Sequence, residues 1–199
     1  LGGNTGYWQI RYADSERRVL ELYRSAAIDP NPYERQKTVR WRDEPVNRPE
    51  CALIGTQWQG GDDATEPGAH PYTVVAASLD HPWFKGTGFR AGDTVEGAVG
   101  YEWDSVAPEC EAVVSPTVLF RWKGRPTPYP AGVYKSTFHS TDATLTTYTA
   151  ASGAQVLAAS SIEFGWSIAG AANREQVVEG MTDPSHPADP RMQRLVRNA

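Results

Sequence analysis

Alternation of apolar and polar side chains is the dominant pattern along this chain, and it predicts a strand-rich protein. Residues 7–12 alternate in the way that a half-buried strand does. The apolar positions at 17–23 fit either a helix capped by Ser15 or the second strand of a hairpin, and we favour the hairpin. Further strands are expected at 51–58, at 72–78, at 94–104, at 112–122 with an interruption at Pro116, and in a hairpin of 143–149 with 155–168.

The predicted strand at 94–104 is the most informative of these. Two-residue periodicity places Val95, Val99 and Trp103 on one face, and Glu102 and Asp104 on the other face above small residues. Carboxylates two positions apart on a strand point the same way, so burial and like charge would raise the pKa of one of them. The pair is therefore the best acid–base candidate in the chain. The alternative is that Asp104 caps a turn and Glu102 pairs with an arginine.

The two ends of the sequence indicate a piece of a longer polypeptide. Leu1-Gly2-Gly3-Asn4 is typical of a buried parallel strand running into a tight turn, where glycine lets the backbone approach a neighbour closely. At the other end, Asp189 is a good N-cap and Pro190 suits the first helical position. We therefore expect a single-domain fragment, 1–199, with a strand end and turn at 1–4, a β-rich body at 5–180, and a linker and starting helix at 181–199.

Composition narrows the functional classes further. The 199 residues carry a formal net charge of −5 without a basic block, which argues against a nucleic-acid partner. No apolar run approaches the roughly 20 residues that span a bilayer, so no membrane association is expected. Cys51 and Cys110 can form one disulfide or stay as two thiols, and the sequence leaves both open. Without an Asn-x-Ser/Thr acceptor the prediction is a cytoplasmic protein, with secretion as the alternative.

Several chemical motifs have a simpler structural interpretation. Gly86 to Gly92 imitates a dinucleotide fingerprint with the wrong spacing, and a glycine turn is the better prediction. Ser136, His139 and Asp142 have the residue types of a hydrolase triad but share a face only on a helix, in a segment that favours strand or loop. The four histidines lack the spacing of a local metal site, and a site assembled from distant segments is the alternative that spacing leaves open.

Two polar residues remain as site candidates besides the 102/104 pair. Asn4 follows a predicted strand at the end where open α/β sheets bind ligands, and its amide can orient a substrate carbonyl or an attacking water. The alternative is that Asn4 only supplies a left-handed turn residue. Glu163 is an acid inside an otherwise apolar predicted strand. Like the 102/104 pair, it is either a functional acid or a structural residue, and its neighbours in the sequence support the functional interpretation less.

The chain also resembles a known family, the N,N-dimethylformamidase large (beta) subunit family, over nearly its whole length. The two most specific motifs are Gly-Gly-Asn-x-x-Tyr-Trp at 2–8 and Gly-Tyr-Glu-Trp-Asp at 100–104. The other matching stretches are Asp29-Pro30, Thr38-x-x-Trp41-Arg42, Pro49-Glu50, His81-Pro82-Trp83-Phe84-x-Gly86-Thr87-Gly88, the strand around Ser152-Gly153 to Trp166, and Met192-Gln193-x-x-Val196-x-Asn198.

The family resemblance implies a fold and an activity that the alternation of apolar and polar residues does not show. It implies an α+β, strand-rich chain that is the C-terminal part of a class I glutamine amidotransferase-like α/β domain with β-hairpin extensions. It also implies hydrolysis of a small amide with one iron held by two Tyr, a His and a Glu, all upstream of Leu1. Asn4 and Glu102 match positions that line the substrate pocket of the family, and we expect both to be catalytic: Asn4 would orient the amide or the water, and Glu102 would act as general base or proton shuttle. We expect Tyr7, Trp8, Asp104 and Glu163 to bind the substrate.

Two hypotheses follow from the sequence. On the first, the chain is the C-terminal portion of an iron-dependent amidohydrolase, inactive alone, whose partners are a small amide, the upstream half of the same polypeptide and either a second copy or a small partner subunit. On the second, the chain is a non-catalytic β-rich module that binds carbohydrate or protein. A row of exposed tryptophans would favour the second; buried tryptophans with Glu102 in a cleft would favour the first.

Overall fold

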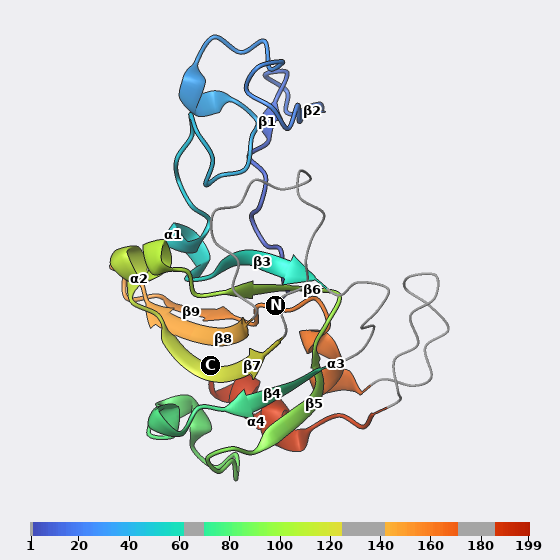
Figure 1. The fold of residues 1–199 in the computed structure, drawn as a ribbon, viewed down its shortest axis with the longest axis vertical. Helices are drawn as coiled ribbons and strands as arrows, with labels where there is room; N and C mark the ends of the chain where they lie inside the picture. Colours follow the sequence, from blue (N-terminus) through green and yellow to red (C-terminus); the bar gives the residue numbers. More distant parts are fainter. Residues whose placement is uncertain (1, 62–69, 125–141, 171–185) are drawn as a thin grey trace.

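A five-stranded antiparallel sheet forms the body of the protein (Figure 1). The computed structural model describes residues 2–61, 70–124, 142–170 and 186–199. The strand order is β5-β4-β7-β8-β9, with bounds β4 His70–Val74, β5 Thr94–Val99, β7 Thr117–Lys123, β8 Asp142–Thr149 and β9 Gln155–Ala158. Every strand pairing within these described ranges is antiparallel, so the strand-rich α+β prediction is confirmed. The parallel sheet of a glutamine amidotransferase-like domain is not seen in them.

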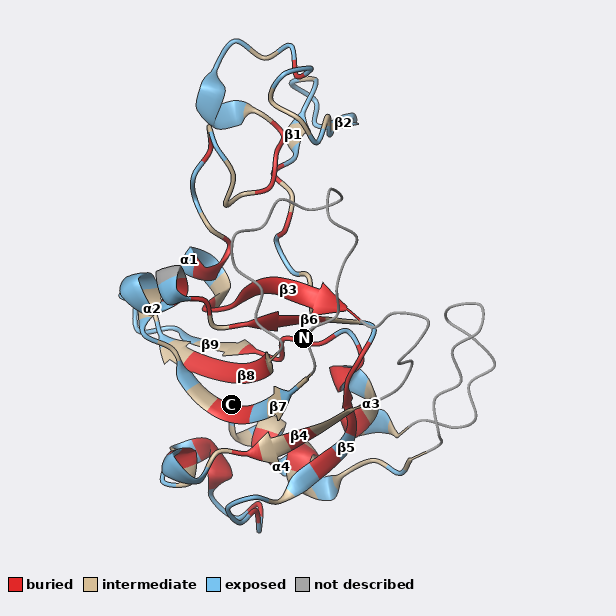
Figure 2. Cartoon of the chain, viewed as in Figure 1, coloured by how far each residue is buried: buried red, intermediate tan, exposed pale blue. Residues whose placement is uncertain are grey.

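A two-stranded ribbon, β3 (Gln57–Gly61) with β6 (Glu102–Ser105), lies beside this sheet. The backbone N–H of Val106 donates to Thr144 Oγ1 at 3.1 Å, and a bridge joins Trp103 to Ser161. All of β3 and most of β6 are buried (Figure 2). The ribbon therefore keeps residues 103–105 buried, while Glu102 at the start of β6 is half-buried.

The C-terminal helix α4, Pro190–Asn198, closes the core, and this prediction is confirmed. Asp189 caps the helix by accepting the backbone N–H of Arg191 at 2.8 Å. Met192 and Leu195, one turn apart, are fully buried in the main hydrophobic cluster with Trp83, Phe84 and Phe120. Trp83 and Phe84 belong to the 3₁₀ turn η3 (Pro82–Phe84), which is packed into this cluster.

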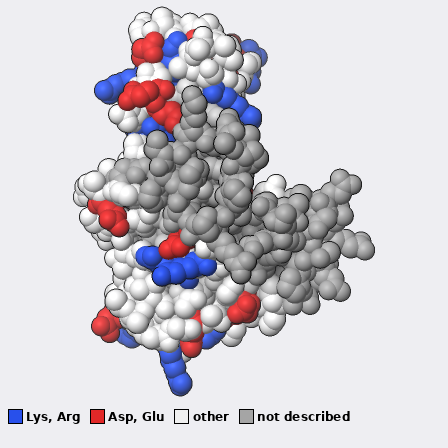
Figure 3. Space-filling model, in the orientation of Figure 1, with Lys and Arg blue, Asp and Glu red and all other residues white. Residues whose placement is uncertain are grey.

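Residues 7–49 form a lobe that projects from the sheet body (Figure 1). The lobe contains the short hairpin of β1 (Arg11–Tyr12) and β2 (Leu20–Glu21) and the 3₁₀ turn η1 (Glu34–Gln36). The predicted hairpin pairing is confirmed, but its strands are much shorter than the predicted 7–12 and 17–23. Its interior is ordered by the buried Asp29 carboxylate, which accepts the backbone N–H of Thr38 at 2.7 Å and pairs with Arg11. Many residues of the lobe are exposed (Figure 2), and its visible face carries both Lys or Arg and Asp or Glu side chains (Figure 3).

The prediction of one continuous strand at 94–104 is wrong. It is two strands, β5 and β6, in different sheets, because Tyr101 takes a left-handed conformation with φ 62° that turns the chain. The predicted strand at 155–168 also ends early: β9 stops at Ala158, Ser160 has φ 59°, and 164–169 is the helix α3 (Phe164–Ala169). Neither alternation pattern therefore extends over one continuous strand.

Three further strand predictions need correction at their ends. Residues 51–54 are the helix α1 (Cys51–Ile54), which stops at Gly55 with φ 81°, so only the end of 51–58 is strand. Residues 108–114 are the helix α2 (Pro108–Val114), and strand β7 starts only after Ser115, whose φ is 44°. In the 72–78 segment the strand stops at Val74 and the turn η2 (Ala76–Ser78) follows.

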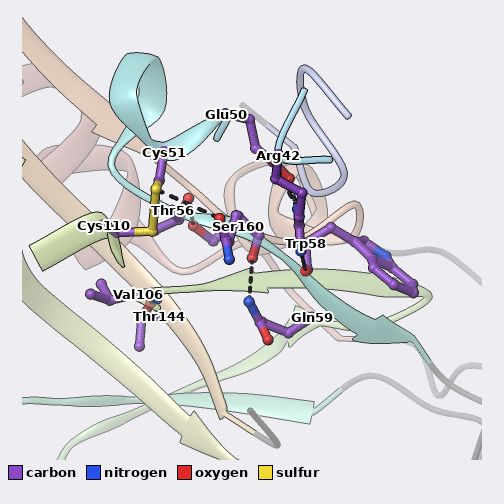
Figure 4. Close-up of a disulfide and its surroundings, with 11 residues drawn as sticks. Arg42, Glu50, Cys51, Thr56, Trp58, Gln59, Val106, Cys110, Thr144 and Ser160 are labelled. Carbon is purple, nitrogen blue, oxygen red and sulfur yellow. Dashed lines mark hydrogen bonds and ion pairs between the residues drawn. A yellow bond between two sulfur atoms is a disulfide. The ribbon is translucent and has the colours of Figure 1, made fainter. Parts of the chain in front are cut away.

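The structure also settles two of the open alternatives. Cys51 and Cys110 form a disulfide that joins α1 to α2 (Figure 4). Gly86, Gly88 and Gly92 all have positive φ, which confirms a glycine turn in place of a nucleotide fingerprint. Ser136 and His139, the first two members of the triad pattern, lie outside the described residues.

Candidate functional site

The turn at residues 2–5 passes directly over the start of β6. A Cβ on Gly3 would lie 2.7 Å from the carbonyl oxygen of Glu102 and 3.1 Å from the backbone nitrogen of Ile162. That oxygen also accepts the Ile162 N–H at 3.1 Å. Only glycine therefore fits between the two segments, and the predicted close backbone approach is confirmed.

Asn4 contacts both carboxylates of β6. Its φ of 54° is left-handed, a conformation that Asn tolerates. Its backbone N–H donates to Asp104 Oδ1 at 2.7 Å, and its side-chain Nδ2 donates to Glu102 Oε2 at 2.6 Å. Because 98 positions separate Asn4 from Glu102, the fold itself creates this contact. The expected meeting of these two residues is confirmed, and their catalytic roles stay predictions.

Glu102 is half-buried, and its electrostatics suit a base. Burial raises the pKa of the Glu102 carboxyl, and the hydrogen bond from Asn4 opposes that rise. Asn4 Oδ1 is buried and has no hydrogen-bond partner in the described structure. Asn4 and Glu102 therefore form a donor–acceptor pair whose remaining oxygens are both acceptors.

Asp104 is almost fully buried, at 1% exposure. Burial raises the pKa of its carboxyl from 3.8 to about 7, and the negative charge of Glu50 adds to this rise. The backbone N–H groups of Asn4 and Thr5 and the charge of Arg42 act in the opposite direction. The side chain is therefore directed at the backbone of the turn.

Sequence reasoning missed the roles of Arg42 and Glu50, although both stand in stretches that resemble the family. Both are largely buried and form an ion pair beside the disulfide (Figure 4), with Arg42 Nε donating to Glu50 Oε2 at 3.2 Å. Arg42 Nη1 also donates to the carbonyl oxygen of Trp58, which is paired with Asp104 across the ribbon. No local pattern in the sequence indicates that the polar connection at 42–50 enters the protein interior.

The other predicted substrate-binding residues lie in three different settings. The buried ring of Tyr7 packs against Trp58 and lies 5.5 Å from the Arg42 guanidinium. Trp8 contacts the edge of Tyr7 and lies under Arg24 in the lobe. Glu163 is buried and precedes α3, with its backbone N–H donating to Ser161 Oγ at 3.2 Å, so it is not a strand residue. Of the predicted site residues, the structure thus brings Asn4 into direct contact with both Glu102 and Asp104.

The seven tryptophans do not form an exposed row. All of them lie in described ranges, where Trp58, Trp83 and Trp103 are buried and the other four are half-buried. The predicted signature of a tryptophan binding platform is therefore missing from the described surface.

Across residues 2–61, 70–124, 142–170 and 186–199, no three His, Cys, Asp or Glu side chains gather in a way that could hold a metal ion. The described helices include none with the length and apolar character needed to cross a bilayer.

Comparison with known proteins gives a family for the chain. A family model described as "N,N-dimethylformamidase beta subunit-like, C-terminal" matches residues 1–179, which is most of the sequence. No curated protein matches the chain.

Proposed function

Because the chain belongs to the N,N-dimethylformamidase beta subunit-like C-terminal family, we propose that it forms part of an enzyme that hydrolyses a small amide. The observation that carries this proposal is the 2.6 Å hydrogen bond from Asn4 to the half-buried carboxylate of Glu102. Asn4 and Glu102 are the residues expected to position and activate the reactants.

The free acceptors of this pair fit a water molecule. Asn4 uses its Nδ2 on Glu102 Oε2, which leaves Asn4 Oδ1 and Glu102 Oε1 as acceptors to which no described residue donates. A buried acceptor without a donor costs about 1–3 kcal/mol, so a donor that reaches Asn4 Oδ1 is favoured there. Water has two donors and matches both oxygens, whereas a fully substituted amide nitrogen has none. Asn4 is therefore assigned to orienting the attacking water.

Glu102 then acts as the general base. Its raised pKa lies closer to neutrality than that of an exposed glutamate, which makes its carboxylate a better proton acceptor. As the water oxygen bonds to the amide carbon, one water proton moves to Glu102 Oε1. When the carbon–nitrogen bond breaks, that proton passes to the leaving amine, and a carboxylic acid is released.

Iron enters only as a further proposal. The described residues offer no ligand cluster, and we derive no catalytic step through a metal. We propose that iron ligands, and the parallel sheet of a glutamine amidotransferase-like domain, belong to chain upstream of Leu1. Metal analysis of the purified full-length protein tests the iron: about one iron per chain supports it, and a metal-free active enzyme contradicts it.

The experiment that tests the hydrolase is a variant comparison in the full-length protein, with N,N-dimethylformamide and unsubstituted formamide as probes. Loss of the carboxylate in Glu102→Gln should lower kcat by roughly 10²–10⁴-fold while the folded structure is retained. Glu96→Gln, an exposed carboxylate on β5, is the matched control and should keep full activity. Equal turnover by wild type and Glu102→Gln would refute the assignment.

A further inference from the structure

The turn at residues 2–5 is fixed to β6 at two points. Glu102 and Asp104 are two positions apart on one strand, so their side chains lie on the same face. Asp104 holds the backbone N–H of Asn4, and Glu102 holds its side-chain amide. With both contacts made, the Asn4 amide has a fixed direction relative to the Glu102 carboxylate.

We infer that Asp104 is a positioning residue: its carboxylate accepts the backbone N–H of Asn4, with the N–H of Thr5 stabilising its charge, and so fixes the direction in which the Asn4 amide faces Glu102. This assignment differs from the substrate-binding role predicted from the sequence. With 1% exposure and its Oδ1 on the turn backbone, the Asp104 side chain is directed into the protein. Its kinetic consequence rests on the proposed hydrolysis, but the positioning itself does not.

The charges around Asp104 make this positioning dependent on pH. One guanidinium, Arg42, makes two contacts with Glu50 and also faces Asp104, so two buried carboxylates share one cation. From β4, Tyr72 has a pKa raised by burial and further by the charge of Asp104, and its hydroxyl donates to the carbonyl of Ala159. On its own strand, Asp104 is accompanied by Glu102.

Protonation of Asp104 weakens its hold on the turn. An ionised carboxylate forms hydrogen bonds roughly twice as strong as those of a neutral acceptor. The pKa of the Asp104 carboxyl near 7 places this change in the neutral range. For an opening of the turn in which Asp104 stays buried, the turn is therefore held more firmly above neutral pH than below it, opposite in sign to the effect of Asp104 ionisation on global unfolding.

Backbone hydrogen exchange tests the inference without any assay of activity. In the full-length protein, the N–H groups of residues 4 and 5 should show a protection factor that rises as pH passes through the neutral range. Asp104→Asn should lower that protection by at least about tenfold and remove its pH dependence, because a neutral amide holds both N–H groups weakly. Glu50→Gln should move the rise to lower pH, by roughly one unit, since it removes the charge that opposes Asp104 ionisation.

Asp29 provides the matched control. It is buried too, at 4% exposure, and its carboxylate accepts two backbone N–H groups in the lobe, those of Thr38 at 2.7 Å and Asn31 at 3.0 Å. Asp29→Asn should lower protection at residues 31 and 38 and leave residues 4 and 5 unchanged. Loss at residues 4 and 5 in Asp29→Asn, or wild-type protection there in Asp104→Asn, would overturn the inference. If Asp104→Asn does not fold, the shift in Glu50→Gln decides, and an unshifted profile counts against it.

A kinetic measurement separates this inference from the proposed function. If N,N-dimethylformamide is hydrolysed, Asp104→Asn should lower kcat more than it raises KM, and Glu50→Gln should extend activity to lower pH. If wild type hydrolyses neither amide probe, the proposed function fails, and the exchange result alone still supports or refutes the role of Asp104.

Discussion

Asn4 donates its side-chain amide to Glu102 across 98 positions of sequence, in a hydrogen bond of 2.6 Å. The contact depends on three local features: a glycine that lets the turn lie on β6, a left-handed Asn, and a buried aspartate below the turn backbone. Each feature can be removed separately by substitution.

Gly3→Ala should displace the turn. Its Cβ would lie 2.7 Å from the Glu102 carbonyl oxygen, which is backbone and cannot move aside cheaply. We expect a loss of about 1–3 kcal/mol in the free energy of unfolding, measured by urea denaturation. Gly165→Ala on α3, where a Cβ meets nothing within 4 Å, is the control and should be neutral or stabilising. Similar effects of the two substitutions would contradict the close approach.

Asn4→Asp should raise the pKa of Glu102 further. It would replace the amide donor with a second carboxylate about as close as the present 2.6 Å contact, and two like charges cannot both ionise easily there. The Glu102 titration, followed by carboxyl carbon NMR, should move up by roughly one pH unit or more. Asn4→Gly keeps the left-handed backbone without the amide and should give a much smaller change, so equal shifts in both variants would exclude the charge effect.

Removal of the disulfide should destabilise the protein. Cys51 and Cys110 are 59 positions apart, and closing a loop of that length restricts the unfolded chain by about 4 kcal/mol. The Cys51→Ala/Cys110→Ala variant should show that loss in urea denaturation. Wild type treated with a reductant should behave in the same way; an unchanged unfolding midpoint in both would show that the crosslink contributes little.

Asp104 should make the fold less stable as pH rises from about 4 to about 7. Its pKa is near 7 in the folded protein against an ordinary 3.8, so the folded state binds the extra proton in this window and stability falls as that proton is lost. Asp104→Asn should remove this part of the slope. The measurement is urea denaturation at pH 4.5 to 7.5, compared between the two proteins so that the opposite contribution of His81, whose pKa is lowered by burial, cancels. An equal slope in both would contradict the raised pKa.

Sequence patterns predicted the elements whose chemistry is local. The cap and proline at 189–190 mark the start of α4, and the two-residue alternation marks the first hairpin. The meeting of Asn4 with Glu102 was expected from the resemblance of two motifs, because a strand pattern alone carries no information about contacts over such a separation.

The misplaced boundaries have a common physical cause. Tyr101, Ser115 and Ser160 each take positive φ, and each marks a point where a predicted strand is broken. Non-glycine residues adopt that conformation rarely, so the sequence gives no signal for it. Gly55 is different: a glycine after a short apolar run is a recognised helix end, and this signal for α1 was present and overlooked.

The crossing of Gly3 over Glu102 and Ile162 also bears on the order of assembly. Residues near the beginning, the middle and the late part of the chain must all be in place before this crossing can form. During synthesis on the ribosome, the first of these segments emerges long before the last, and it stays without its counterparts until more than 160 residues have been made. Any catalytic activity would therefore appear only late in synthesis and in a single step, and a chain truncated before Ile162 should have no activity.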